Sequence, residues 1–142
     1  MNAITLDAAS SPSTSTSSSN AAKWVGRALS GFAVLFLLFD VSIKLSGHSA
    51  VAQSAQELGL PMAQMVPTAL TLLACVTLYV IPRSSVLGAV LLTGYLGGAI
   101  EVHARVGSPV FSHLLFPVYV AAFVWGGLYL RDLRVRQMIS AR

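Results

Sequence analysis

Charged residues are scarce in this chain of 142 residues, since only 10% are Asp, Glu, Lys or Arg while 55% are hydrophobic. A soluble domain usually carries about 25% charged residues. The mean hydropathy of +0.73 points the same way. This composition excludes an ordinary water-soluble domain and indicates a chain that lives mostly in lipid.

Several chemistries are excluded because their residues are missing. Cys75 is the only cysteine, and a disulfide or thiol relay needs two. The glycines of residues 94–98 lie in an apolar run, where a phosphate-binding loop cannot form. A nucleophile elbow and a basic face with interleaved aromatics are also absent, the latter apart from residues 131–136. We therefore expect neither a stand-alone enzyme nor a nucleic-acid-binding protein.

Four apolar runs are long enough to cross a bilayer, which takes roughly 20 residues in a helix. They cover residues 24–45, 62–81, 85–102 and 110–130. Their short connections at 82–84 and 105–109 require antiparallel neighbours. The sequence predicts an all-α integral membrane protein, a four-helix up-down-up-down bundle over residues 23–136.

The two ends of the chain differ from these runs. Residues 10–19 are almost entirely Ser and Thr, so residues 1–22 are predicted to be a disordered tail, and residues 137–142 a short basic tail. An alternative is a signal peptide, with Lys23 and Arg27 before the apolar run and the small residues 50–52 as a cleavage site. Against it, the stretch from residue 40 to 52 is long for a cleavage region.

Basic residues are distributed unevenly between the two sides of the predicted bundle. Lys44 and Arg105 fall on one side, and the other side carries Lys23, Arg27, Arg83, Arg131, Arg134, Arg136 and Arg142. By the positive-inside rule, both termini are predicted to lie in the cytoplasm of a bacterium, with the helices in its inner membrane. The basic residues 131–136 then meet the anionic inner leaflet.

Small residues and aromatics predict how the helices pack. Gly94 and Gly98 form a GxxxG pair, which lets helix backbones approach closely. Gly88, Gly97 and Ala99 extend this pair in the third run, and the fourth run carries Gly126 and Gly127. We expect packing within the chain rather than dimerisation, because three partner helices are tethered nearby. Four aromatics are predicted at the cytoplasmic interface: Trp24, Tyr79, Trp125 and Tyr129.

Ionisable residues within the spans are the candidate functional residues, because each costs about 2.5 kcal/mol or more near the bilayer centre unless it is paired or hydrated. Asp40 precedes Lys44 by four residues on one helix face, the favourable order for an ion pair. Glu101 and Arg105 repeat this spacing. The predicted topology brings both pairs to the same side, with His48 in the first outer loop. The sequence thus proposes an outer-leaflet polar pocket, whose candidate residues are Asp40, Lys44, Glu101, His103 and His113.

Two other interpretations of these residues stay open. The acidic and basic residues can form self-contained ion pairs whose long basic side chains reach the headgroups. His103 and His113 can ligate a metal or haem, although no HxH or HxxxH spacing supports a metal and haem requires facing histidines.

Several segments resemble the DoxX-like family of small bacterial membrane proteins. In the first half these are residues 35–45 (LFLLFDVSIKL), 57–61 (ELGLP) and 78–83 (LYVIPR); in the second half they are residues 87–99 (LGAVLLTGYLGGA), 116–119 (FPVY) and 125–132 (WGGLYLRD), with His103, Arg105, Gly107 and Pro109 between them. The resemblance extends over about residues 27–136. Glu101 departs from it, because a small or hydroxylated residue is expected there.

The resemblance implies an accessory subunit of a quinone-linked or oxidative-stress redox complex, with membrane redox proteins as partners. A quinone headgroup between His103 and Lys44 is the implied ligand, and no cofactor is required. A small transporter and a non-catalytic membrane interaction protein remain alternatives. The uneven distribution of Lys and Arg argues against the transporter, because small multidrug exporters assemble as inverted dimers with little orientation bias.

Overall fold

The computed structural model describes residues 16–140, which form helices joined by turns and contain no strand. The elements are α1 (Thr16–Leu45), α2 (Ser49–Glu57), the short 3-10 helix η1 (Met62–Gln64), α3 (Met65–Val80), α4 (Ser85–Arg105), the π-helix η2 (Val110–Leu114), α5 (Phe116–Arg131) and α6 (Leu133–Ser140). Four stretches are long and apolar enough to cross a membrane: Asn20–Leu45, Met62–Val80, Ser85–Arg105 and Val110–Arg131. The predicted all-α integral membrane bundle is confirmed.

The helices extend further at both ends of the chain than hydropathy predicts. Of the predicted tail, residues 1–22, the structure describes residues 16–22, which form the first turns of α1; the rest lies outside the described residues. A helix that has begun gains one hydrogen bond per added residue, and no Pro or Gly interrupts residues 16–22. The tail predicted from residue 137 starts inside α6.

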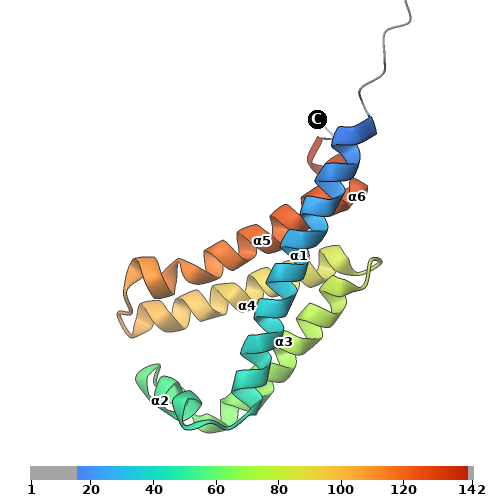
Figure 1. Ribbon diagram of the computed structural model, residues 1–142. Coiled ribbons are helices and arrows are strands. Elements are labelled where there is room, and N and C mark those ends of the chain that lie inside the picture. Colours follow the sequence, from blue (N-terminus) through green and yellow to red (C-terminus); the bar gives the residue numbers. More distant parts are fainter. Residues whose placement is uncertain (1–15, 141–142) are drawn as a thin grey trace, which may run out of the picture.

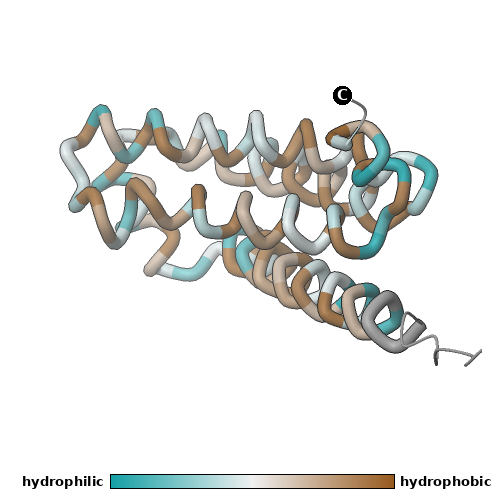
Figure 2. Tube along the Cα trace, turned by 90° about the horizontal axis from the view of Figure 1, so that it is seen from above, coloured by the Kyte–Doolittle hydropathy of each residue, from teal (hydrophilic) through white to brown (hydrophobic). Residues whose placement is uncertain are grey.

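The four long helices form a ring in which α1 packs against α5 and α3, and α4 packs against α3 and α5 (Figure 1). One end of the ring, here called the terminal end, carries the first turns of α1, the α3–α4 turn and α6. The other end, called the α2 end, carries α2 and η2. Hydrophobic residues dominate the long helices, and hydrophilic residues gather towards the helix ends (Figure 2). This pattern suits helices that face lipid along their length.

The terminal half of the bundle is closely packed at glycines. A Cβ added at Gly88 would lie 2.2 Å from the backbone nitrogen of Tyr79, and one at Gly127 would lie 2.5 Å from Oγ of Ser30. Tyr79 is fully buried; its hydroxyl donates to the Val124 carbonyl at 2.8 Å and lies 2.9 Å from Ser30 Oγ. Three helices, α1, α3 and α5, therefore meet at one tyrosine.

The predicted packing at small residues is wrong for the GxxxG pair and confirmed for Gly88 and Gly127. Nothing lies within 4 Å of where a Cβ would sit at Gly94, Gly97 or Gly98. The close packing occurs at the other predicted glycines, where a Cβ at Gly88 would meet Tyr79 of α3 and one at Gly127 would meet Ser30 of α1. The small residues of the GxxxG pair face open space rather than a neighbouring helix.

Two of the four aromatics predicted at the cytoplasmic interface are exposed at the surface of the bundle. Trp24 and Tyr129 are exposed near the terminal end. Tyr79 lies there too, but it is buried in the core. Trp125 donates its ring N–H to Thr93 Oγ1 at 2.8 Å, which ties α5 to α4. Hydropathy places an aromatic residue along the helix, but the helix rotation decides whether it faces lipid or a partner.

Candidate functional site

A cavity of about 690 Å³ lies in the half of the bundle near the α2 end, bounded by α1, α2, α3 and α4. It exists because the helices that pack closely in the terminal half diverge here. Gly94 and Gly98 line it on the α4 side, and their missing side chains leave the space open. Sites for small-molecule ligands typically measure about 300–1,000 Å³, so this cavity has the size of a ligand site.

Helix α2 supplies the wall at the bundle end. It is bracketed by two turns in which Gly47 and Gly59 adopt left-handed backbone angles, φ 63° and 64°, a conformation that glycine adopts without steric cost. Val51 and Ala55 of α2 are buried with Met65 of α3, and both also line the cavity. The hydropathy analysis missed α2, because it is too short and too polar to register as a span.

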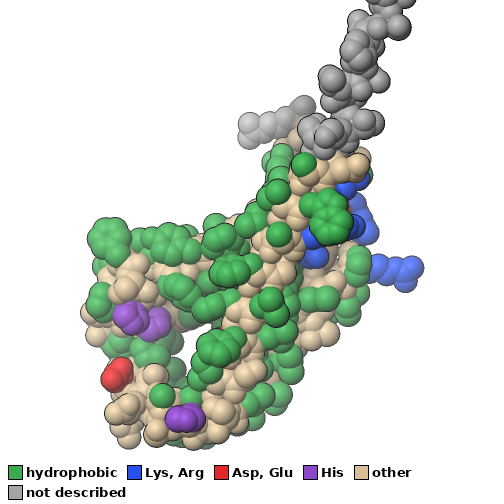
Figure 3. Space-filling model, viewed as in Figure 1, with side chains coloured by type: hydrophobic (Ala, Val, Ile, Leu, Met, Phe, Trp, Pro, Cys, Tyr) green, Lys and Arg blue, Asp and Glu red, His purple; other side chains and the backbone are tan. Residues whose placement is uncertain are grey.

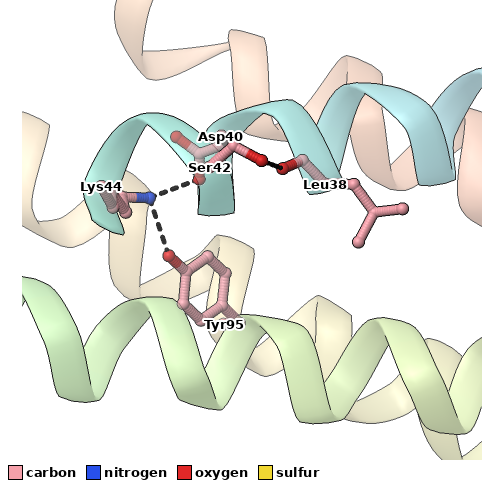
Figure 4. Close-up of polar contacts among 5 residues, drawn as sticks. All are labelled: Leu38, Asp40, Ser42, Lys44 and Tyr95. Carbon is pink, nitrogen blue, oxygen red and sulfur yellow. Dashed lines mark hydrogen bonds and ion pairs between the residues drawn. The ribbon is translucent and has the colours of Figure 1, made fainter. Parts of the chain in front are cut away.

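The polar centre of the cavity consists of Asp40 and Lys44 on α1 and Tyr95 on α4. Lys44 forms an ion pair with Asp40, as its spacing predicts, and donates a second hydrogen bond to the Tyr95 hydroxyl at 3.0 Å (Figure 4). The side chains of Lys44 and Asp40 are 22% and 35% exposed. An ammonium group has three N–H donors, so one remains for another acceptor. The ammonium group thus links α1 to α4 inside a largely apolar space.

Ser42 lies between Asp40 and Lys44 in the sequence but does not belong to the polar centre. Its hydroxyl donates to the Leu38 carbonyl on its own helix at 2.8 Å and takes no part in the contact with Tyr95 (Figure 4). A serine that bonds back to its helix is satisfied without a tertiary partner. Only one helical face of α1 therefore contributes polar groups to the cavity.

Glu101 and Arg105 do not form the ion pair that their spacing predicts. Within residues 16–140 the ion pairs are Lys44–Asp40 and Arg134–Asp132. Glu101 and Arg105 are both exposed near the end of α4, where ordering two long side chains offsets most of the attraction. Glu101 nevertheless lines the cavity, so its carboxylate adds negative charge there.

The predicted histidines separate into different environments. His103 lines the cavity, and its Nδ1 lies 3.1 Å from Ser108 Oγ. The ring of His113 packs against that of His103, with centroids 5.6 Å apart, but His113 does not line the cavity and contacts Ser112 instead. His48 precedes α2 and does not line the cavity either. In the described part of the chain, no group of three or more His, Cys, Asp or Glu is placed to hold a metal.

Four of the five candidate residues therefore line one cavity: Asp40, Lys44, Glu101 and His103. The sequence analysis missed Tyr95 as a site residue. A tyrosine in the middle of a span was the available signal, because a buried tyrosine hydroxyl usually finds a hydrogen-bond partner. Its partner could not be named, because Lys44 lies 51 positions away in the sequence.

These features define a class: a small multi-pass membrane protein whose four-helix bundle is closed at one end and hollowed into a ligand-sized cavity at the other. The chain belongs to the DoxX-like family, whose family model matches residues 28–127. That match includes the polar centre of the cavity and the close-packed glycines Gly88 and Gly127. No curated protein and no solved structure matches the chain.

Proposed function

We propose that this protein is a non-catalytic subunit of a quinone-linked or oxidative-stress redox complex and that its cavity holds a quinone headgroup. The observation that carries the proposal is the placement of Lys44, a part-buried cation with an N–H to spare, in the wall of a mostly apolar cavity. A quinone ring is apolar over its faces and presents two carbonyl acceptors at its edges. Cavity and headgroup are therefore complementary in polarity.

Two further groups can fix the orientation of such a ring. The Tyr95 hydroxyl accepts its hydrogen bond from Lys44, which leaves the tyrosine's own hydrogen free to donate. His103 lines the same cavity and can donate or accept through its ring nitrogens. Gly94 and Gly98 leave the α4 side without side chains, so a flat ring can lie against that helix.

The transporter alternative is less well supported by the packing. A transporter must open its site to each side of the membrane in turn. The terminal half is filled by the contacts of Gly88 with Tyr79 and of Gly127 with Ser30. Opening there would separate these backbones and expose the Tyr79 hydroxyl, which is bonded to both α1 and α5.

Binding of a decyl-chain benzoquinone tests the proposed site. The purified protein in lipid nanodiscs should bind the quinone, and Gly98→Leu, which places a side chain on the wall against which the ring lies, should weaken binding at least about tenfold. Gly97→Leu is the matched control, because Gly97 is on the same helix with no atom within 4 Å and does not line the cavity. Equilibrium titration measures both. An intact wild-type protein that binds no quinone would rule the function out, and equal weakening in both variants would rule out this site.

The same proposal places the protein in the bacterial cytoplasmic membrane with the terminal end inside. Lys and Arg side chains gather near that end (Figure 3), and basic residues favour the cytoplasmic side of short loops. The cavity then opens in the outer half of the membrane.

Cysteine labelling in whole cells tests this orientation. With Cys75 replaced by alanine, a cysteine at Arg83 should be protected from a membrane-impermeant maleimide, and a cysteine at Gly107 should react. Permeabilised cells provide the control, since both positions should react there. Labelling of residue 83 in intact cells would reverse the topology and move the cavity to the inner leaflet.

A further inference from the structure

Helix α1 changes its neighbour along its length. In the terminal half it runs beside α5, where the ring pairs Phe32–Phe123 and Phe36–Phe116 have centroids 5.6 and 5.2 Å apart. Beyond Phe36, the polar contact of α1 is to α4, through Lys44 and Tyr95. The chain that precedes α5, the π-helix η2, packs against α4. The part of α1 near the α2 end therefore diverges from η2.

This divergence opens the side of the bundle. The ribbon shows α1 leaving the α4–α5 pair towards the α2 end (Figure 1), and the space-filling view shows an opening between them on the same face (Figure 3). The cavity is lined by residues of α1, α2, α3 and α4 but by none of α5 or η2. The wall of the cavity therefore includes no residue of α5 or η2.

Exposed apolar side chains lie on this part of α1. Phe39 on α1 is 63% exposed, and Ile43, which also lines the cavity, is 39% exposed. The Phe36–Phe116 pair lies where the two helices part. An opening at this depth faces acyl chains rather than water, and its rim offers a lipid chain contacts of the same kind. A water-soluble ligand would gain nothing from this route.

Helix α2 forms part of the end of the cavity that faces water. Helix α2 crosses the α2 end, and its residues Ala50, Val51 and Ala55 line the cavity. Val51 and Ala55 are also buried against Met65. A ligand arriving from water meets this helix and the polar residues Glu101 and His103, whereas a ligand dissolved in the bilayer meets the apolar side opening.

We propose that the cavity is loaded sideways from the bilayer, and that its ligand is a lipid with a compact hydrogen-bond-accepting headgroup and a long apolar chain. The headgroup contacts Lys44 and Tyr95, and the chain leaves through the opening between α1 and η2, over the Phe36–Phe116 pair. This inference rests on the proposed function and specifies the ligand as a long-chain quinone rather than a soluble one.

A photoreactive quinone tests the route of the chain. The probe is a decyl-chain benzoquinone with a diazirine near the end of its chain, added to the protein in nanodiscs. After illumination, mass spectrometry should locate the label on residues 32–43 of α1 and 110–116 of η2 and α5. Labelling there should fall about tenfold in Gly98→Leu, and likewise in Gly94→Leu, because each variant places a side chain on the wall against which the headgroup lies.

Two controls separate site-directed from random labelling. A decyl diazirine without the quinone should label lipid-facing residues equally in the wild type and in both variants. Gly97→Leu should label like the wild type with the quinone probe.

The outcomes distinguish this inference from the function on which it rests. Headgroup-dependent label confined to α2 and η1 would show entry from water, which overturns sideways loading and leaves quinone binding intact. A chainless benzoquinone that binds as tightly as the decyl form would overturn the chain-bearing ligand class. Absence of both headgroup-dependent labelling and quinone binding would refute the proposed function itself.

Discussion

Replacing Gly88 with alanine should destabilise the folded bundle by about 3 kcal/mol or more, since overpacking a well-filled contact costs about 1–3 kcal/mol and more where the neighbour cannot move. The added Cβ would lie 2.2 Å from the nitrogen and 2.5 Å from the Cα of Tyr79. Both atoms are backbone, so no side-chain rotation relieves the clash. The helices α3 and α4 must separate, and the Tyr79 contacts with α1 and α5 then weaken. Unfolding in a graded denaturing detergent measures the loss.

The matched control is Gly97→Ala, nine residues later on the same helix. No atom lies within 4 Å of the added methyl group, and surface substitutions of this kind usually change stability by less than about 0.5 kcal/mol. Gly97→Ala also controls for the change in helix propensity, because both variants replace glycine with alanine within α4. Equal stability of the two variants would contradict the close α3–α4 contact.

Replacing Lys44 with methionine should cost about 1–3 kcal/mol of stability, between the small effect of losing a surface ion pair and the 3–5 kcal/mol of breaking a fully buried one. The intermediate value follows from the partial exposure of both partners. The substitution leaves the Asp40 carboxylate within the membrane span without its cation. The double variant Asp40→Asn with Lys44→Met removes the stranded charge and should recover most of the lost stability.

The double variant distinguishes a purely structural role of Lys44 from a role in ligand binding. If it folds but neither binds quinone nor restores the phenotype of a deletion strain, Lys44 is a ligand contact as well as half of an ion pair. If it folds and is fully active, the site hypothesis fails. A double variant no more stable than Lys44→Met would show that Asp40 has a partner other than Lys44.

Tyr95→Phe is the control for the contact between helices. It removes the hydroxyl that accepts from Lys44 and leaves the Asp40–Lys44 pair in place. A typical hydrogen bond contributes about 0.5–1.5 kcal/mol, more when one partner is charged. The cost should therefore be smaller than that of Lys44→Met, and the difference between the two variants isolates the effect of stranding Asp40.

The comparison of Asp40–Lys44 with Glu101–Arg105 shows how far local spacing predicts a site. Both pairs have the same i,i+4 order, and only the first forms an ion pair in residues 16–140. Lys44 is held in place by a third group, Tyr95, which no local pattern connects to it. Glu101 and Arg105 lie exposed near a helix end, where nothing orders them. The i,i+4 spacing shows which ion pairs can form, and the surrounding residues determine which of them do form.

The glycines show the same limit for packing. The GxxxG pattern at Gly94 and Gly98 predicted a helix contact, and the structure shows a cavity wall there. The close contacts are at Gly88 and Gly127, which form no such motif with each other. A glycine allows a neighbouring helix to pack closely but does not select which helix that is. The helix that packs there is determined by crossing angles that depend on the whole bundle.

The sequence by itself determined the membrane setting, the number and antiparallel order of the spans, the ion pair within α1 and the family, because hydropathy, connection length and i,i+4 spacing act over short stretches of chain. Only the tertiary structure decided that the bundle is closed at Tyr79 and open at Gly98, that Tyr95 completes the polar centre, and that His113 lies outside it. These features depend on distances between segments dozens of residues apart, such as Lys44 and Tyr95. Such distances are set by how all four helices pack together, which no single stretch of sequence records.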